Sequence, residues 1–208
     1  MINIKNNQVE IPFSYYLNLY KKVDPVKAGK RCDIEYNRLT KQFKVNLMGQ
    51  DYYVNFPEFS VEIKDENPKH TILQTSSYAQ LLIIRYLIAG KAMPSAGKFC
   101  SYRDFPWGEV YYRQFYDRCI RRTARTFEKN PDAIKNIMNK INAKKLKEAD
   151  YSCEFEFMKG LNIKFLYWKA DEEFPSSAQI LFSDNFQYAF SAEDLAVIGD
   201  ITIGMLNK

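Results

Sequence analysis

Hydrophobic residues recur at helical spacing in the first two thirds of the chain and alternate with polar residues in the last third. An apolar stripe over residues 11–23 predicts a first helix, and Asp24 followed by Pro25 supplies the N-cap and first residue of a second. Residues 81–89 are apolar on nearly every side except at Arg85, so they predict a central buried helix. A guanidinium on such a helix must reach water or a carboxylate, and we expect Arg85 to pair with an acid near the C-terminal sheet.

Short alternating segments before this helix predict strands. Residues 43–48 and 51–56 surround Gly49 and Gln50, and a two-residue turn that begins with glycine predicts a type II′ hairpin. A further strand is expected over residues 59–63, ahead of a polar loop.

The last third predicts antiparallel pairs and a final helix. Gly160 turns the chain between the first two strands, and Ser191 opens a Ser-Ala-Glu-Asp run that resembles a capping box and predicts a helix through Val197. The predicted strands are 153–157, 163–168, 179–183 and 186–190.

These elements predict an α+β fold of antiparallel hairpins and meanders packed on a central buried helix, with a helical middle segment. We expect one domain over residues 1–208, made of N-terminal helices plus a hairpin (1–73), a helical part (74–150) and a C-terminal meander with its helix (151–208). At 208 residues and 46% hydrophobic content, the chain needs no metal or disulfide to fold. Its most apolar stretch is far shorter than the roughly 20 residues of a membrane span.

The cysteines and the single histidine give little sign of a metal site. The four cysteines form no C-x-x-C pair, and the chain has no glycine-rich nucleotide loop, so we expect neither a metal nor an evident cofactor. Free, mostly buried thiols in a cytoplasmic protein are expected instead. His70 lies in a polar turn and is interpreted as a solvated loop residue. The cysteines are Cys32, Cys100, Cys119 and Cys153.

Positive charge gathers in the helical middle. Residues 108–147 hold eleven Lys and Arg against four Asp and Glu, while the whole chain has a net charge of +5. Helices are expected from about 109 to 129 and over 132–143, and the basic residues of the first share one sector. Such faces are usually solvated, so weak nucleic-acid binding through this helix is an alternative and not the main interpretation. The basic residues are Arg118, Arg121, Arg122, Arg125 and Lys129.

Two loop-rich stretches, 97–111 and 168–182, combine aromatic, proline and charged residues to a degree that packing alone does not require. We expect their side chains to converge on one concave ligand-binding patch, where an arginine beside carboxylates could clamp an anion. The expected patch residues are Tyr102, Arg103, Trp107, Trp168, Asp171 and Glu173.

Three functions remain open from these residues. The first is a small-ligand-binding or accessory module, whose partner would be a small anionic ligand or a protein. The second is a small-molecule enzyme that uses Asp171 and Glu173 as acid and base or as hard-metal ligands, with Arg103 as the anion clamp. The third is the nucleic-acid binding mentioned above. A structural alternative is that the acids form a solvated turn tied to Arg103.

The same two stretches carry a family resemblance. The motif Ser-Tyr-Arg-Asp-Phe-Pro-Trp-Gly, followed by a tyrosine at 111, and the motif Trp-Lys-Ala-Asp-Glu-Glu-Phe-Pro-Ser-Ser-Ala-Gln-Ile-Leu-Phe resemble the prokaryotic domain-of-unknown-function family numbered 3786. The similarity is clearest over residues 77–208, including the run that starts at Ser191. The resemblance implies no known activity, substrate or catalytic residue. Ser176 stands where the family pattern has a second proline.

Overall fold

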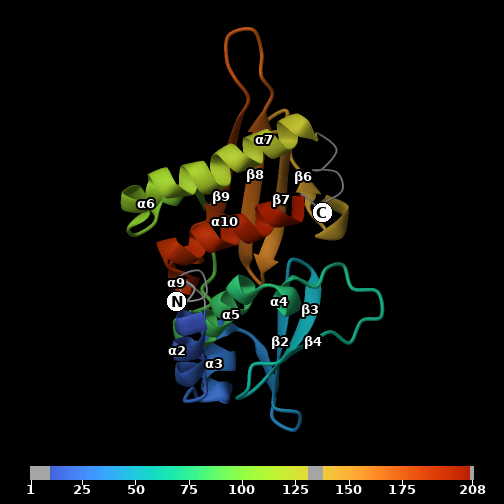
Figure 1. Ribbon diagram of the computed structural model, residues 1–208, viewed down its shortest axis with the longest axis vertical. Coiled ribbons are helices and arrows are strands. Elements are labelled where there is room, and N and C mark those ends of the chain that lie inside the picture. Colours follow the sequence, from blue (N-terminus) through green and yellow to red (C-terminus); the bar gives the residue numbers. More distant parts are fainter. Residues whose placement is uncertain (1–9, 131–137, 207–208) are drawn as a thin grey trace, which may run out of the picture.

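The computed structural model describes residues 10–130 and 138–206, which form two parts joined by one continuous hydrophobic core (Figure 1). The fold is α+β, as predicted. The elements of the N-terminal part are α2 (Glu10–Tyr20), α3 (Pro25–Cys32), β1 (Glu35–Asn37), β2 (Gln42–Leu47), β3 (Gln50–Asn55), β4 (Val61–Glu62), α4 (Ile72–Thr75) and α5 (Ser77–Ala89). The elements of the C-terminal part are β5 (Phe99–Cys100), η1 (Tyr102–Asp104), α6 (Gly108–Phe115), η2 (Tyr116–Ile120), α7 (Arg121–Lys129), β6 (Lys144–Lys145), β7 (Tyr151–Met158), β8 (Leu161–Trp168), β9 (Ser177–Ser183), α9 (Phe186–Ala189) and α10 (Ala192–Leu206).

The N-terminal sheet is antiparallel in the order β1-β2-β3-β4. Its hairpin turn differs from the prediction by one residue: Leu47 pairs with Gln50, so Met48 and Gly49 are the two turn residues. Both have positive φ, of 46° and 76°, which is typical of a type I′ turn and not of type II′. Met48 is fully buried and its N–H donates to the Phe157 carbonyl at 2.9 Å, so packing against the second sheet stabilises this conformation.

Helix α5 is the central buried helix that the sequence predicts. Its N-cap is Ser76, whose hydroxyl accepts from the Ala79 N–H at 3.3 Å, and six of its side chains are buried against α2, α3 and α10. The expected strand over 59–63 is confined to β4, because Phe59 adopts a left-handed φ of 58° and turns its ring into the core instead.

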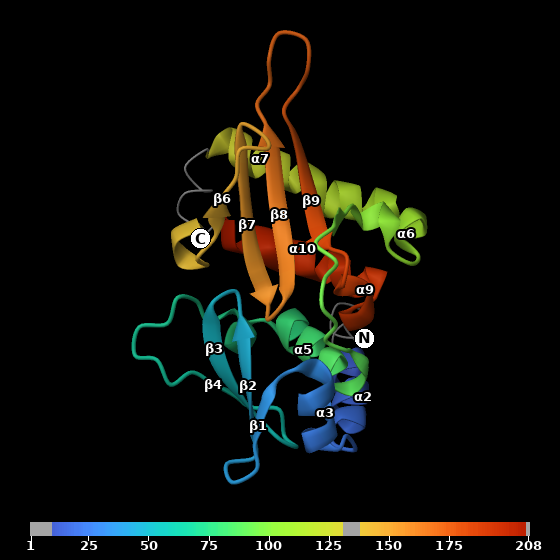
Figure 2. The same ribbon diagram turned by 180° about the vertical axis from the view of Figure 1, so that it is seen from behind.

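The C-terminal sheet has the antiparallel order β5-β9-β8-β7-β6. Helices α6, α7 and α10 cover one face, and in Figure 2 none of the helices that the structure describes lies over the opposite face. Inward residues alternate along the strands, as the period-2 pattern predicts. On α7, Phe127 packs edge-on against Phe165 and Tyr167 of β8, with ring centroids 6.4 and 5.4 Å apart.

The predicted fourth strand of this part is wrong, because residues 186–189 form helix α9. Phe186, Ala189 and Phe190 are buried at spacings of three and four, which is a helical period. Asn185 stabilises the turn before the helix: its amide donates to the carbonyls of Met93 and Gly160 at 2.8 and 2.9 Å.

Helix α10 begins with the predicted capping box. The Asp194 carboxylate accepts from the Ser191 N–H at 3.0 Å, and the Ser191 hydroxyl accepts from the Asp194 N–H at 3.3 Å. The helix continues well past the predicted end at Val197. Arg85 pairs with Asp194 and Glu193, both at 3.2 Å, so it has the expected carboxylate partners, which belong to the helix that covers the C-terminal sheet.

The helical middle runs from Gly108 to Lys129 with a π-helical turn, η2, between α6 and α7. Of the helix expected over 132–143, residues 132–137 lie outside the described residues and 138–140 are helical.

Candidate functional site

The first predicted site stretch surrounds η1. Tyr102 is a core residue: its ring stacks on Phe115 at 4.0 Å and its hydroxyl donates to the Ala192 carbonyl at 2.9 Å. Arg103 lies on the surface, where it pairs with Glu109 at 3.5 Å and stacks over the Tyr112 ring at 3.8 Å. The Trp107 side chain is 74% exposed and is therefore not a core anchor.

The second stretch forms the β8–β9 hairpin, whose loop projects beyond the sheet in Figure 1. Trp168 is the last residue of β8 and pairs with Ser177. Asp171 folds the loop on itself, because its Oδ1 accepts from the N–H groups of Glu173 and Phe174 at 2.9 and 2.7 Å. Residues 171–175 are all exposed.

The two stretches meet where β5 pairs with the end of β9, but the six expected patch residues stay in two separate groups. Cys100, next to η1, pairs with Phe182 at one end of β9, whereas Trp168 pairs with Ser177 at the other end. Five residue steps along β9, which span about 17 Å, lie between these two pairs. The predicted convergence on one patch is therefore wrong. Of the structural alternative, the solvated turn is present, but the tie to Arg103 is wrong, since Arg103 pairs with Glu109.

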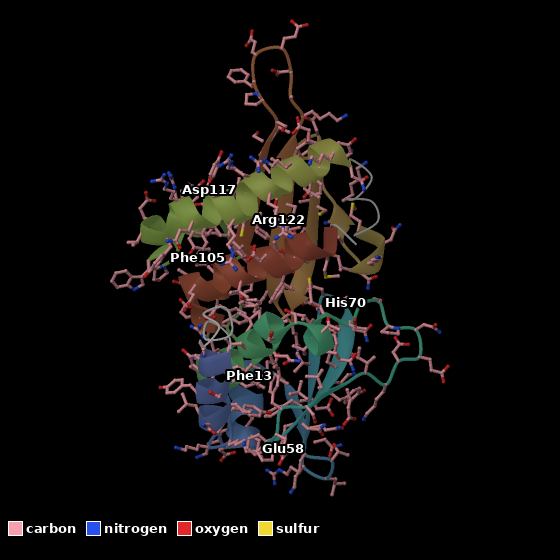
Figure 3. All side chains as sticks on the ribbon, viewed as in Figure 1. Phe13, Glu58, His70, Phe105, Asp117 and Arg122 are labelled. Atoms are coloured by element: carbon pink, nitrogen blue, oxygen red, sulfur yellow. The ribbon has the colours of Figure 1, made fainter. Side chains whose placement is uncertain are left out.

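A different cleft, of about 630 Å³, lies between the two parts of the molecule. Its walls are the segment 69–78, the η2 turn and the last three turns of α10, and Figure 3 shows His70 at this boundary. The apolar lining residues include Ile72, Tyr78, Val197, Ile201 and Met205. On α10 the last three lie on one helical stripe, so one wall of the cleft is continuous apolar surface.

Cations gather around this apolar wall. Lys69, Arg118 and Lys140 line the cleft together with a single carboxylate, Asp200. Asp200 already contacts Arg118 closely and Arg122 at 3.5 Å, and Arg122 lies between α7 and α10 in Figure 3. Within residues 10–130 and 138–206, no carboxylate forms a salt bridge with Lys69 or Lys140. The cleft therefore has an excess of positive charge.

His70 is half-buried in this cleft, not solvated as the sequence suggested. Its Nδ1 lies 2.9 Å from the Tyr52 hydroxyl and its Nε2 lies 3.4 Å from the Met48 carbonyl oxygen. Burial lowers the pKa of His70, and the nearby charges of Lys69 and Lys140 lower it further. The imidazole is consequently neutral near pH 7 and fixed by its neighbours.

The η2 turn places Arg118 at the cleft and Cys119 behind it. A π-turn adds a residue to the helix, and such turns are frequent at functional sites. Burial raises the pKa of the Cys119 thiol to about 12, so this sulfur is protonated and is not a nucleophile at neutral pH. All four cysteines are free, and three of them are buried.

Two features of the sequence belong to this cleft, but neither differs from what an ordinary surface loop or an ordinary amphipathic helix shows. Lys69 and His70 lie in a loop that reads as solvent-exposed, and the apolar α10 stripe continues beyond Val197 through Gly204. Neither feature shows that the loop and the helix meet, because Val197 lies 127 positions after His70 in the sequence.

Comparison with known proteins places the chain in a family. Residues 24–205 match the family model described as "Domain of unknown function (DUF3786)". The chain belongs to the DUF3786 family. All residues that line the cleft fall inside this DUF3786 region. Searches of curated proteins and of solved structures found no significant match.

Two further findings concern the part of the DUF3786 chain that the structure describes. Among those residues, no helix combines the length and apolar character needed to cross a membrane. The same residues include no cluster of three or more His, Cys, Asp or Glu side chains placed to hold a metal ion.

Proposed function

We propose that this DUF3786 domain is a binding module for a small organic anion that has an apolar body. The observation that carries the proposal is the cleft in which Lys69, Arg118 and Lys140 face the apolar stripe of α10. A volume of about 630 Å³ suits a small molecule, since ligand pockets usually measure about 300–1,000 Å³. Cations at the rim would hold the charged group, and Val197 and Met205 would contact the apolar body.

The lining residues favour binding over catalysis. His70 is the single histidine of the chain, and both of its ring nitrogens already have hydrogen-bond partners. The enzyme alternative has less support, because Asp171 and Glu173 lie on an exposed loop and Asp171 is committed to the backbone of that loop. A resident cofactor is not part of the proposal.

Nucleic-acid binding also has less support. Asp200 partly neutralises Arg118 and Arg122, and Asp117 pairs with Arg121 at 2.8 Å. A phosphate backbone would have to compete with these internal carboxylates. Four free thiols support a cytoplasmic location as part of the proposal, since thiols stay reduced there.

A fluorescence titration with 8-anilinonaphthalene-1-sulfonate tests the proposal, because this probe joins one anionic group to aromatic rings. The double variant Lys69→Gln/Lys140→Gln should weaken probe binding about tenfold, which corresponds to roughly 1.4 kcal/mol from two partly screened charges. The control Lys21→Gln/Lys30→Gln removes the same charge from exposed positions on or near α2 and α3.

The two double variants separate the possible outcomes. If both double variants bound the probe equally more weakly than the wild type, net charge alone would attract the probe, and the proposal would be overturned. Unchanged affinity in both would show that the probe binds elsewhere, which overturns it too. Cooperative urea unfolding of each variant excludes a loosened core as the source of fluorescence.

A further inference from the structure

Strand β9 leaves most of one backbone edge unpaired. On that side, β5 pairs only with Phe182 and Ser183, the last two residues of the strand. Over the ranges that the structure describes, residues 177–181 have a strand partner only on the β8 side. Every second residue of this segment therefore presents its N–H and C=O groups away from the sheet.

This edge lacks the features that usually protect a free strand. Edge strands commonly carry a lysine or another charge, a proline or a bulge that prevents pairing with another chain. Residues 177–181 read Ser-Ala-Gln-Ile-Leu, with no charge and no proline, and they pair with β8 in unbroken register. The edge is thus able to accept another strand.

A groove of about 440 Å³ runs between this edge and the helical segment α6–η2–α7. Tyr112, Tyr116, Ile120 and Ala124 supply most of its apolar helical wall, and η1 closes one end with Tyr102. A strand beside a helix with an apolar groove between them is the arrangement that binds extended peptides by strand addition. The groove shares no lining residue with the cleft described above.

The charged residues that line the groove favour an acidic occupant. Arg121 and Arg125 line it, with Glu128 as the acid among the lining residues. Asp117 pairs with Arg121, while Arg125 forms no salt bridge with any residue that the structure describes. The groove is thus lined by two arginines and one glutamate, and Arg125 is the guanidinium that an acidic segment could meet without displacing a carboxylate of a described residue.

We propose that β9 and the α6–η2–α7 wall bind an extended, acidic polypeptide segment of a partner protein as an added strand. Alternate side chains of the segment would enter the apolar groove, and acidic residues would face Arg121 and Arg125. A second copy of this chain fits less well. Edge-to-edge pairing of two copies would bring their arginine-lined walls together, and the uncharged edge itself offers no acids to them.

Fluorescence anisotropy with labelled, end-capped heptapeptides tests the proposal. The first peptide alternates glutamate with valine, the second alternates lysine with valine, and the third is the acidic peptide with alternate amides N-methylated. At about 0.05 M salt, where screening is weak, the acidic peptide should bind at least about tenfold tighter than the other two. Hydrogen exchange at residues 177–181 should slow when it binds.

Charge reversal provides the matched test. Arg121→Glu/Arg125→Glu should reverse the preference between the acidic and the basic peptide. Arg38→Glu/Arg113→Glu, which changes the same charge at exposed positions outside the groove, should not.

Four results would overturn the proposal: no peptide binding at about 1 mM, equal binding of the N-methylated peptide, no change in exchange over 177–181, or protection of that segment by self-association alone.

Discussion

Replacing Arg85 by methionine should destabilise the protein by about 2–3 kcal/mol at pH 7. Arg85 is the charged residue of the apolar helix α5, and its side chain is 22% exposed while that of Asp194 is 8% exposed. Removing one partner of a buried ion pair typically costs about 3–5 kcal/mol. The expected loss is smaller here, because the Ser191 N–H and hydroxyl still donate to the Asp194 carboxylate at 3.0 and 2.8 Å.

The same substitution should change how stability depends on pH. Burial raises the pKa of Asp194 in the folded protein, and Arg85 opposes this rise. Because this pKa is higher in the folded than in the unfolded protein, the free energy of unfolding falls as the pH rises. The fall begins near the unfolded-state pKa of about 4 and ends above the folded-state pKa. Loss of Arg85 raises that pKa further. The difference between variant and wild type should therefore be smallest below pH 4 and largest near pH 7.

Urea denaturation at several pH values measures both effects. Arg103→Met is the matched control, since Arg103 and Glu109 form an exposed pair and the change should stay within about 0.5 kcal/mol. If Arg85→Met lost no more than this control at pH 7, or lost the same amount at every pH, the assignment of a buried Arg85–Asp194 pair would be refuted.

Three further predictions concern α10, the thiols and the hairpin loop. Gly204→Ala should raise stability by about 0.5–1 kcal/mol in urea denaturation, because an added Cβ meets open space on a helix; a loss would contradict this. Ellman's reagent should label Cys100 first in the native protein and all four thiols in urea, since burial protects the other three. Asp171→Ala should speed hydrogen exchange at Glu173 and Phe174 while leaving the unfolding midpoint almost unchanged, and a large shift in that midpoint would count against it.

Periodicity predicted the elements whose burial follows a regular pattern. Helix α5, the β7–β8 hairpin and the capping box at Ser191 all follow from local spacing. Prediction failed where distant contacts decide the local structure. Met48 occupies a left-handed turn position because the second sheet buries it, and α9 is stabilised by the packing of Phe186 against the rings of Phe157 and Phe182.

The candidate site was harder to predict than the fold. The two motifs are unusual in composition, yet their expected patch residues lie next to opposite ends of β9, so the length of this strand keeps them apart. The cleft forms from residues that each look ordinary in sequence, such as Lys69 and Gly204. Only the packing of α10 against the segment that starts at residue 69 turns them into a site.

Calorimetric titration of 8-anilinonaphthalene-1-sulfonate into two Gly204 variants tests the cleft most directly. Gly204 lines the cleft, and no atom lies within 4 Å of a Cβ added there, so a methyl group meets open space and a longer side chain would take up volume in the cleft. Gly204→Ala should keep the wild-type affinity. Gly204→Leu should weaken binding at least about tenfold while the protein stays as stable as the alanine variant. Equal affinity of the leucine and alanine variants would contradict the cleft as the ligand site.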